Sequence, residues 1–196
     1  MTTSDGFSKP GRKDHAVAIG VFDGVHLGHK AVIRSAVESG KKSTVITFNP
    51  HPRIVLGYEV QLVCSLDRRL DLIRDQGVDE VLVVDFTPDL SRLTPQEFVQ
   101  AVLEPVGAQA IHIGTDFRFG HSRKGDAEVL RALGYSVESI PMVSGVSSSE
   151  IRTSVGEGKV LRAAEMLGRP FELSGEVVVG DQRGGTLGFP TANLII

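Results

Sequence analysis

The 196-residue chain is long enough for one domain of ordinary size plus a remainder, and its 41% apolar fraction is typical of a protein with a sizeable core. Its 21 basic and 24 acidic residues leave a net charge of −3, which gives no electrostatic footprint for nucleic acid or an anionic membrane. Cys64 is the only cysteine, residues 1–14 form a polar lead, and no apolar run approaches the roughly 20 residues of a membrane span, so we expect a cytoplasmic protein without a disulfide or secretion signal.

Short β-branched runs alternate with segments of helical period along the first 140 residues. Strands separated by helices need crossover connections, so the sequence predicts a doubly wound α/β domain with a mostly parallel sheet. The charged run 67–75 would be the solvated face of its helix. In chain order the expected elements are strand 16–22, helix 29–39, strand 43–48, helix 66–76, strand 80–86, helix 95–103, strand 110–113, helix 126–133 and strand 136–140.

The pattern changes after about Pro170. Two strand-like segments, 171–180 and 189–196, flank the glycine-rich stretch GDQRGGTLG, and no helical segment follows. Two strands and a loop bury too little apolar surface to fold alone. We therefore divide the chain into the lead 1–14, the α/β domain 15–168, and residues 169–196, which are either an accessory hairpin or the incomplete start of a second domain.

The stretch GVFDGVHLGHK, residues 20–30, sets His26 and His29 three residues apart where the first strand gives way to a helix. Anions bind at such strand ends, because backbone N–H groups of the helix N-terminus point there. The stretch is neither a Walker loop nor the dinucleotide G-x-G-x-x-G pattern. These residues alone leave open a phosphate site, histidines on a solvated helix start, and a metal site. The further ligands available to a metal would be Asp23 and the distant His51, His112 and His121.

A second anion site is predicted at GVSSSEIRTSV, residues 145–155. Three serines precede an expected helix start, with Arg152 in the first turn. Serine hydroxyls, helix N–H groups and a guanidinium fork are suited to phosphate oxygens. A serine N-cap followed by an exposed arginine is the alternative interpretation.

Two aromatic stretches, TFNPHP at 47–52 and GTDFRFG at 114–120, follow the second and fourth strands. Their phenylalanines could simply pack in the core. Alternatively, the two stretches could border a planar ligand, which needs apolar faces and a few convergent polar groups. The polar groups available there are Asn49, His51, Asp116 and Arg118.

These stretches together resemble one family. Residues 20–29 match the G-x-F-D-x-x-H-x-G-H signature of the nucleotidyltransferase superfamily, and residues 147–152 resemble S-S-T-x-I-R with Ser149 in place of threonine. Residues 47–52 and 114–120 resemble T-F-x-P-H-P and G-x-D/N-F-x-F-G, and residues 167–194, with P-T-A-N, resemble the entry to a riboflavin kinase module. The ordered matches identify the chain as a member of the bacterial FAD synthetases.

The resemblance implies a Rossmann-like adenylyltransferase over residues 15–168 that transfers AMP from ATP to FMN, giving FAD and pyrophosphate, with Mg²⁺ accompanying the triphosphate. Residues 169–196 would be the first strands of a riboflavin kinase barrel, without kinase activity of their own. The partners would be small-molecule substrates, not nucleic acid or a membrane. The implied site residues are His26, His29, Ser148, Ser149 and Arg152 for catalysis; Gly20, Phe22, Asp23, Gly24, Gly114 and Asp116 for the nucleotide; Asn49, Pro50, His51, Pro52, Phe117, Arg118 and Phe119 for the flavin; and Thr191 and Asn193 for metal in a completed kinase module.

Two other functions remain as alternatives. A nucleotidyltransferase could act on another phosphorylated acceptor, such as phosphopantetheine or phosphocholine. A non-catalytic paralogue could bind flavin or nucleotide without releasing pyrophosphate.

Overall fold

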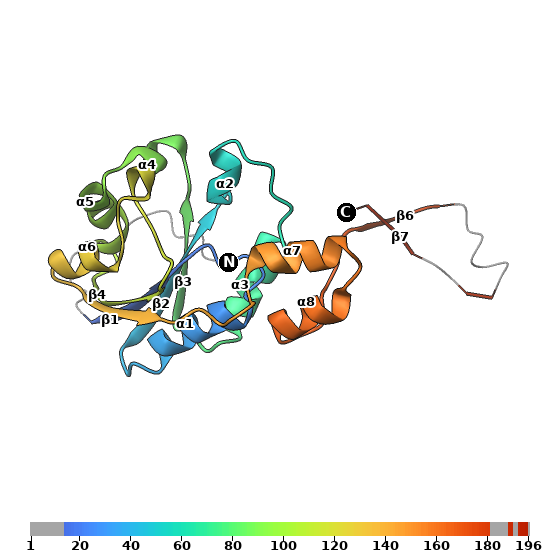
Figure 1. Cartoon of the computed structure of the whole chain (residues 1–196), viewed down its shortest axis with the longest axis horizontal. Helices are drawn as coiled ribbons and strands as arrows, with labels where there is room; N and C mark the ends of the chain where they lie inside the picture. The colour runs from blue at the N-terminus through green and yellow to red at the C-terminus, as the bar shows by residue number, and fades with distance from the viewer. Residues whose placement is uncertain (1–13, 181–187, 190–191, 196) are drawn as a thin grey trace.

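A five-stranded parallel sheet forms the centre of the computed structural model, which describes residues 14–180, 188–189 and 192–195 (Figure 1). The strand order is β3-β2-β1-β4-β5. β1 is buried along its whole length, as expected for a strand covered on both faces. The chain crosses to opposite sides of β1, and this reversal point is where open α/β sheets bind ligands. The strands are β1 (His15–Ile19), β2 (Lys42–Asn49), β3 (Glu80–Asp85), β4 (Ala108–Gly114) and β5 (Ser136–Ile140).

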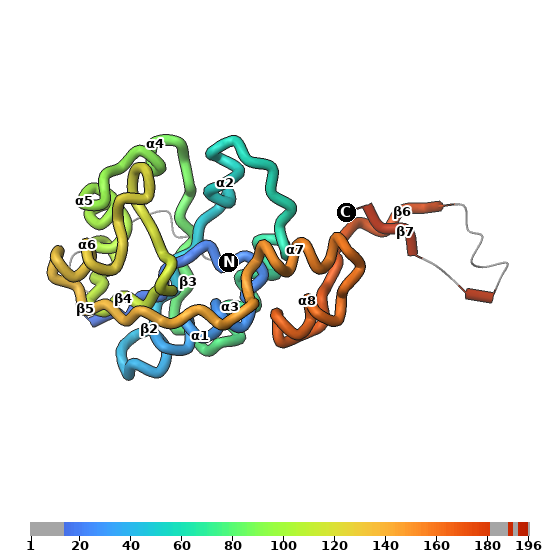
Figure 2. Tube along the Cα trace, in the orientation of Figure 1, coloured from blue at the N-terminus to red at the C-terminus, as the bar shows by residue number. Residues whose placement is uncertain are grey.

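Helices cover both faces of this sheet, so the predicted doubly wound fold is confirmed (Figure 2). On one face α1 (Leu27–Val37) and α3 (Leu66–Arg74) bury Ile33 and Ile73 against β1 and β2. On the other face Phe98 and Leu130 belong to a second core cluster. Each fully buried aliphatic or aromatic side chain stabilises the fold by about 1.5–3 kcal/mol. The second layer contains α4 (Pro88–Arg92), α5 (Pro95–Phe98), the π-helical turn η1 (Val99–Leu103) and α6 (Ala127–Ala132).

A pair of helices, α7 (Ser148–Gly156) and α8 (Val160–Leu167), follows the sheet. Ile151 and Ala163 bury each other's apolar surface in a third cluster that also contains Val63. The Lys30 ammonium donates a hydrogen bond to the Leu167 carbonyl at 3.1 Å, which attaches the end of α8 to α1. These contacts pack α7 against α8 and attach α8 to α1.

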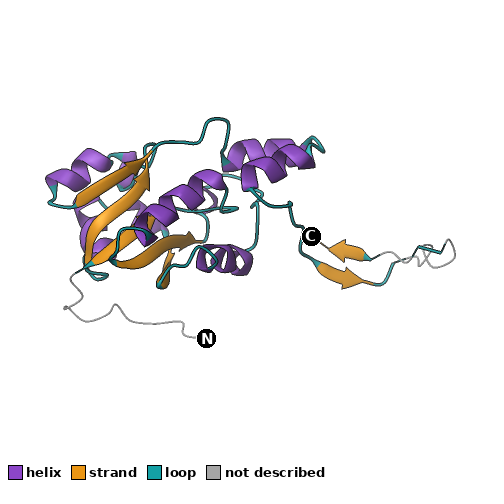
Figure 3. Cartoon of the chain, turned by 90° about the horizontal axis from the view of Figure 1, so that it is seen from below, coloured by secondary structure: helices purple, strands orange, loops and turns teal. Residues whose placement is uncertain are grey.

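The last two strands, β6 (Glu176–Val178) and β7 (Asn193–Ile195), form an antiparallel pair that stands apart from the parallel sheet (Figure 3). Val177 is 65% exposed, so this pair does not cover its apolar side chains. Thr191 and most of the stretch from 180 to 188 lie outside the described residues. None of the helices in the described part of the chain has the length and apolar character that crossing a membrane requires.

The structure differs from the sequence prediction at several element boundaries. β1 ends at Ile19 instead of residue 22, because Phe22 has a φ of 54°, which no strand residue adopts. The helix expected over 95–103 begins with the predicted Thr94 capping box but continues as a π-helical turn. Three α-helices, α2 (Pro52–Val55), α4 and α8, and the 3₁₀ turn η2 (His121–Arg123) were not predicted.

Candidate functional site

The loop between β1 and α1 has a strained backbone. Phe22, Gly24 and Val25 have φ values of 54°, 80° and 41°, and the Val25 N–H closes the turn onto the Phe22 carbonyl at 3.0 Å. A non-glycine residue in the left-handed region costs on the order of 1–3 kcal/mol, and surrounding contacts must compensate for it. Such strain is characteristic of functional sites.

The two glycines of this loop serve packing. A Cβ on Gly24 would come within 2.6 Å of Val63, and a Cβ on Gly20 would meet the Phe22 ring at 3.0 Å. Phe22 itself is 2% exposed. Side chains of the protein therefore fill the space beside both glycines, and the approach of a nucleotide to Gly20, Phe22 and Gly24 stays a prediction.

The imidazoles of His26 and His29 stack on each other at the N-terminus of α1. Their ring centroids are 3.5 Å apart with an interplanar angle of 20°. His26 is the N-cap: its Nδ1 accepts the His29 backbone N–H at 3.3 Å. A neutral imidazole that accepts at Nδ1 carries its hydrogen on Nε2, so His26 can donate to a ligand.

Both histidines are neutral near pH 7. Burial lowers the pKa of His26 to about 4, against the opposing effect of the Asp116 carboxylate. Burial lowers the pKa of His29 well below its usual value, and the neighbouring His26 and Arg69 lower it further. The His29 Nδ1 is buried without a hydrogen-bond partner among the described residues. The pair can therefore act as neutral donors that gain positive charge when an anion binds.

Asp23 joins this loop to α7. Its carboxylate, 2% exposed, accepts the Val63 backbone N–H at 2.9 Å and pairs with the Arg152 guanidinium at 3.3 Å. Its backbone carbonyl accepts the Ser148 hydroxyl at 2.9 Å. Burial raises the pKa of Asp23, opposed by the Val63 hydrogen bond and the Arg152 charge. The two predicted anion sites are thus adjacent.

α7 begins about two residues earlier than expected, at Ser148. Ser147 is the N-cap, and its hydroxyl accepts the Glu150 N–H at 3.1 Å. Ser148 and Ser149 are first-turn residues, and Arg152 lies in the second turn, which corrects its predicted place in the first. The Arg152 Nε donates to the Gln61 carbonyl at 2.8 Å, so that carbonyl and Asp23 orient the guanidinium and leave other N–H groups of its fork available.

The residues that follow β2 reach the same region. His51 is the N-cap of α2; its Nδ1 accepts the Arg53 N–H at 3.1 Å, so its hydrogen also lies on Nε2. Burial lowers its pKa to about 4, and the charges of Arg152, Arg69 and Arg53 act in the same direction. Asn49 is half-buried at the end of β2, Pro50 is exposed, and Pro52 is the first residue of α2.

The residues that follow β4 divide between the site and the core. Asp116 is exposed, and its charge partly offsets the lowering of the His26 pKa by burial. A Cβ on Gly114 would lie 3.0 Å from the Asp116 carboxylate. The Arg118 guanidinium donates to the Phe117 carbonyl at 2.7 Å. Phe119 is 6% exposed and contacts the core residue Phe98, so packing in the core accounts for it, and its contact with a flavin stays a prediction. The half-buried Phe117 remains available.

Sequence reasoning missed Arg69. We placed the run 67–75 on a solvated helix face, whereas Arg69 is 3% exposed. Its guanidinium donates to the carbonyls of Val21 and Phe48, each at 3.0 Å. An arginine between apolar helix positions gives no local signal of burial, because its carbonyl partners belong to distant segments.

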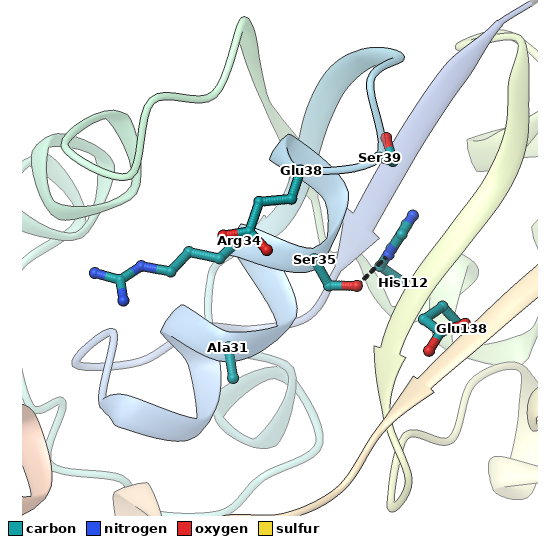
Figure 4. Close-up of a pocket in the computed structure, with 7 residues that line it drawn as sticks. All are labelled: Ala31, Arg34, Ser35, Glu38, Ser39, His112 and Glu138. Carbon is teal, nitrogen blue, oxygen red and sulfur yellow. Dashed lines mark hydrogen bonds between the residues drawn. The ribbon is translucent and has the colours of Figure 1, made fainter.

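Asn193 and a polar cavity beside α1 lie away from the two histidines and Arg152. Asn193 of β7 lies against Gly180, where a Cβ would come within 2.1 Å of its amide nitrogen. A cavity of about 580 Å³ lies along the C-terminal half of α1 (Figure 4). There His112, whose Nδ1 lies 2.8 Å from the Ser35 hydroxyl, faces Glu138 across the strands. His112 was considered as a metal ligand, but none of the site residues implied by the family resemblance lines this cavity.

The parallel sheet and the helix-terminal histidines define an α/β domain of the HxGH nucleotidyltransferase type. Residues 8–154 match the FAD synthetase family and residues 167–196 match the riboflavin kinase family. The chain therefore belongs to the FAD synthetase family.

Relatives and a solved structure agree with this assignment. The bifunctional riboflavin kinase/FMN adenylyltransferase of Listeria monocytogenes is 36% identical over 194 residues, covering 91% of this chain and 61% of that protein. The protein of the same name from Pseudomonas fluorescens is 35% identical over 200 residues, covering 95% of this chain and 64% of its own length. A crystal structure from Streptococcus pneumoniae, described as a macrolide-efflux protein, matches with a TM-score of 0.85 and 34% identity over 93% of this chain and 64% of that one. The chain thus spans less than two thirds of these proteins.

Proposed function

We propose that this chain is an FMN adenylyltransferase. A phosphate oxygen of FMN attacks the α-phosphorus of ATP, the bond from that phosphorus to the β-phosphate bridging oxygen breaks, and FAD and pyrophosphate form. The FMN phosphate is ionised at neutral pH, so the reaction needs no base to generate the nucleophile. The task of the protein is to position the phosphates and stabilise their charge.

The observation that carries the proposal is the attachment of α7 to the loop before α1 through Asp23. The Asp23 ion pair with Arg152 and its hydrogen bond from Ser148 bring a guanidinium and a helix N-terminus beside the stacked histidines. One triphosphate can then contact donors from both sides.

We assign the roles accordingly. His26 and His29 hold the triphosphate by neutral N–H donors, and their protonation becomes more favourable as negative charge develops. Ser148, Ser149 and Arg152 hold the departing pyrophosphate. The residues that follow β2 and β4, with Asn49, His51 and the half-buried Phe117, border the flavin.

Magnesium would be held mainly by the phosphates of ATP. Mg²⁺ in such sites takes one or two carboxylates and several phosphate or water oxygens. Asp116 is the exposed carboxylate beside His26 and fits this role, whereas Asp23 is engaged by Val63 and Arg152. When bound, the ion would neutralise part of the triphosphate charge.

The test is to incubate the chain with ATP, Mg²⁺ and one acceptor at a time, and to identify the products by chromatography. We expect FAD and pyrophosphate from FMN, and no product from phosphopantetheine or phosphocholine. We propose the cytoplasm as the place of this reaction in the cell. With riboflavin we expect no FMN from these residues alone, because the exposed β6–β7 pair forms no closed core. Transfer to another acceptor, or tight FMN binding without pyrophosphate release, would favour one of the alternatives and contradict the proposal.

A further inference from the structure

Arg69 occupies an unusual position for a charged side chain. It extends from α3 to the carboxyl ends of β1 and β2, where it is 3% exposed. No described carboxylate forms an ion pair with it, and Asp23, the carboxylate whose charge raises the pKa of Arg69, is paired with Arg152. Keeping a cation buried without a direct partner is costly, so its hydrogen bonds must be favourable.

Those hydrogen bonds connect the two strand ends that lead into the site. The backbone ladder between β1 and β2 finishes with the Gly20 N–H donating to the Ile46 carbonyl at 3.1 Å. Beyond that point the Arg69 fork bridges the Val21 and Phe48 carbonyls, each at 3.0 Å. The Val21 carbonyl also accepts the Thr47 hydroxyl at 2.9 Å.

The bridged carbonyls belong to functional segments. Val21 immediately precedes the strained Phe22, and His26 follows four residues later. Phe48 immediately precedes Asn49 and the segment assigned to the flavin. One guanidinium therefore holds together the starts of two segments: the segment after Val21, which leads to His26, and the segment after Phe48, which is assigned to the flavin.

We propose that Arg69 is a positioning residue for adenylyl transfer: its fork fixes the loop that carries the stacked histidines against the end of β2, and its unpaired charge lies beside His29. The inference rests on the proposed function. Burial is the main reason that the pKa of His29 is low, and the Arg69 charge lowers the pKa of that imidazole further.

The test compares Arg69→Gln, which removes the charge, with Arg69→Lys, which keeps the charge but lacks the planar fork. Arg68→Gln is the matched control, because Arg68 is the adjacent residue on α3 and pairs with Glu172 at the surface, at 2.6 and 2.7 Å. The measurements are kcat with FMN and ATP, thermal unfolding, and the NMR titration of the His29 imidazole.

We expect Arg69→Gln to lower kcat by about 10²-fold, the scale of a misplacement of about 1 Å at a reacting centre. Its His29 pKa should rise, whereas in Arg69→Lys the pKa should stay low and kcat should be partly restored. Arg68→Gln should resemble the wild type in kcat and in the titration of His29. If folded Arg69→Gln keeps wild-type kcat, or if His29 titrates as in the wild type, the inference is wrong.

If Arg69→Gln does not fold, Arg69→Lys decides the matter. A lowered kcat with an unchanged His29 titration would support the role of the fork, and wild-type kcat would overturn it. If the wild-type chain makes no FAD, the proposed function fails first. The His29 titration still tests the placement of Arg69 in that case.

Discussion

Replacing His26 by asparagine or alanine separates the structural role of its imidazole from its proposed chemical role. The His26 Nδ1 caps α1 by accepting the His29 N–H at 3.3 Å. Asparagine is among the best N-caps and can accept the same N–H, whereas alanine cannot. Near pH 7 we expect His26→Ala to be about 1 kcal/mol less stable than His26→Asn. Both variants should lose about 10²–10³-fold in turnover, the loss expected for one transition-state donor.

The pH dependence of stability gives the same prediction a second test. The pKa of His26 is about 4 in the folded protein against the ordinary 6.5. The unfolded chain therefore binds more protons in this window, and the contribution of His26 to stability is lost as pH falls from 6.5 toward 4. Between about pH 7 and about pH 5 the loss is about 2 kcal/mol. His26→Asn should not show this loss of stability. The pKa of His51 is lowered in the same way, but its contribution is the same in the wild type and in His26→Asn and cancels in the comparison.

Urea denaturation of the wild type and the two variants at both pH values, with FAD formation measured in parallel, checks these expectations. The stability of the wild type relative to His26→Asn should decrease on acidification. A constant difference across the two pH values would show that His26 is not a buried neutral imidazole. Wild-type turnover in His26→Asn would remove its role in holding phosphate.

Three further substitutions test other parts of the site. His29→Ala should lower turnover by about 10²–10³-fold in the FAD assay, and near-normal turnover would contradict its phosphate role. Gly24→Ala should lower the free energy of unfolding by at least about 2 kcal/mol, since its φ is 80° and its Cβ would lie 2.6 Å from Val63; unchanged denaturation would refute this packing role. Asp23→Asn should lower turnover by about 10-fold through loss of the Arg152 tether, without lowering the melting temperature, because burial raises the pKa of this carboxyl and its ionised form is disfavoured in the fold. A large fall in melting temperature, or full activity, would contradict that expectation.

Much of the fold could be predicted because its signals are local. β-Branched runs alternate with helical segments, and the Thr94 capping box and the glycine after α3 mark helix ends in a few residues of sequence. The histidine and serine segments could likewise be assigned to strand ends and helix starts. The sequence thus predicts that the histidine and serine segments contribute to the site.

The rest depends on contacts between distant residues. The burial of Arg69 depends on carbonyls 48 and 21 residues away along the chain, and the need for Gly24 depends on Val63. Phe119 has the same local pattern as Phe117, yet packing against Phe98 and Gly125 places it in the core. Asp23 had a motif to mark it, but its ion pair with Arg152 spans 129 residues.

The most direct measurement is the NMR response of three side chains to α,β-methylene-ATP, an analogue that cannot release pyrophosphate. We predict that the imidazole signals of His26 and His29 and the guanidinium signal of Arg152 shift along one common saturation curve, because a single triphosphate contacts all three. Shifts of the histidines alone, or of Arg152 at a separate affinity, would show that these groups do not hold one ATP molecule and would contradict the proposed site.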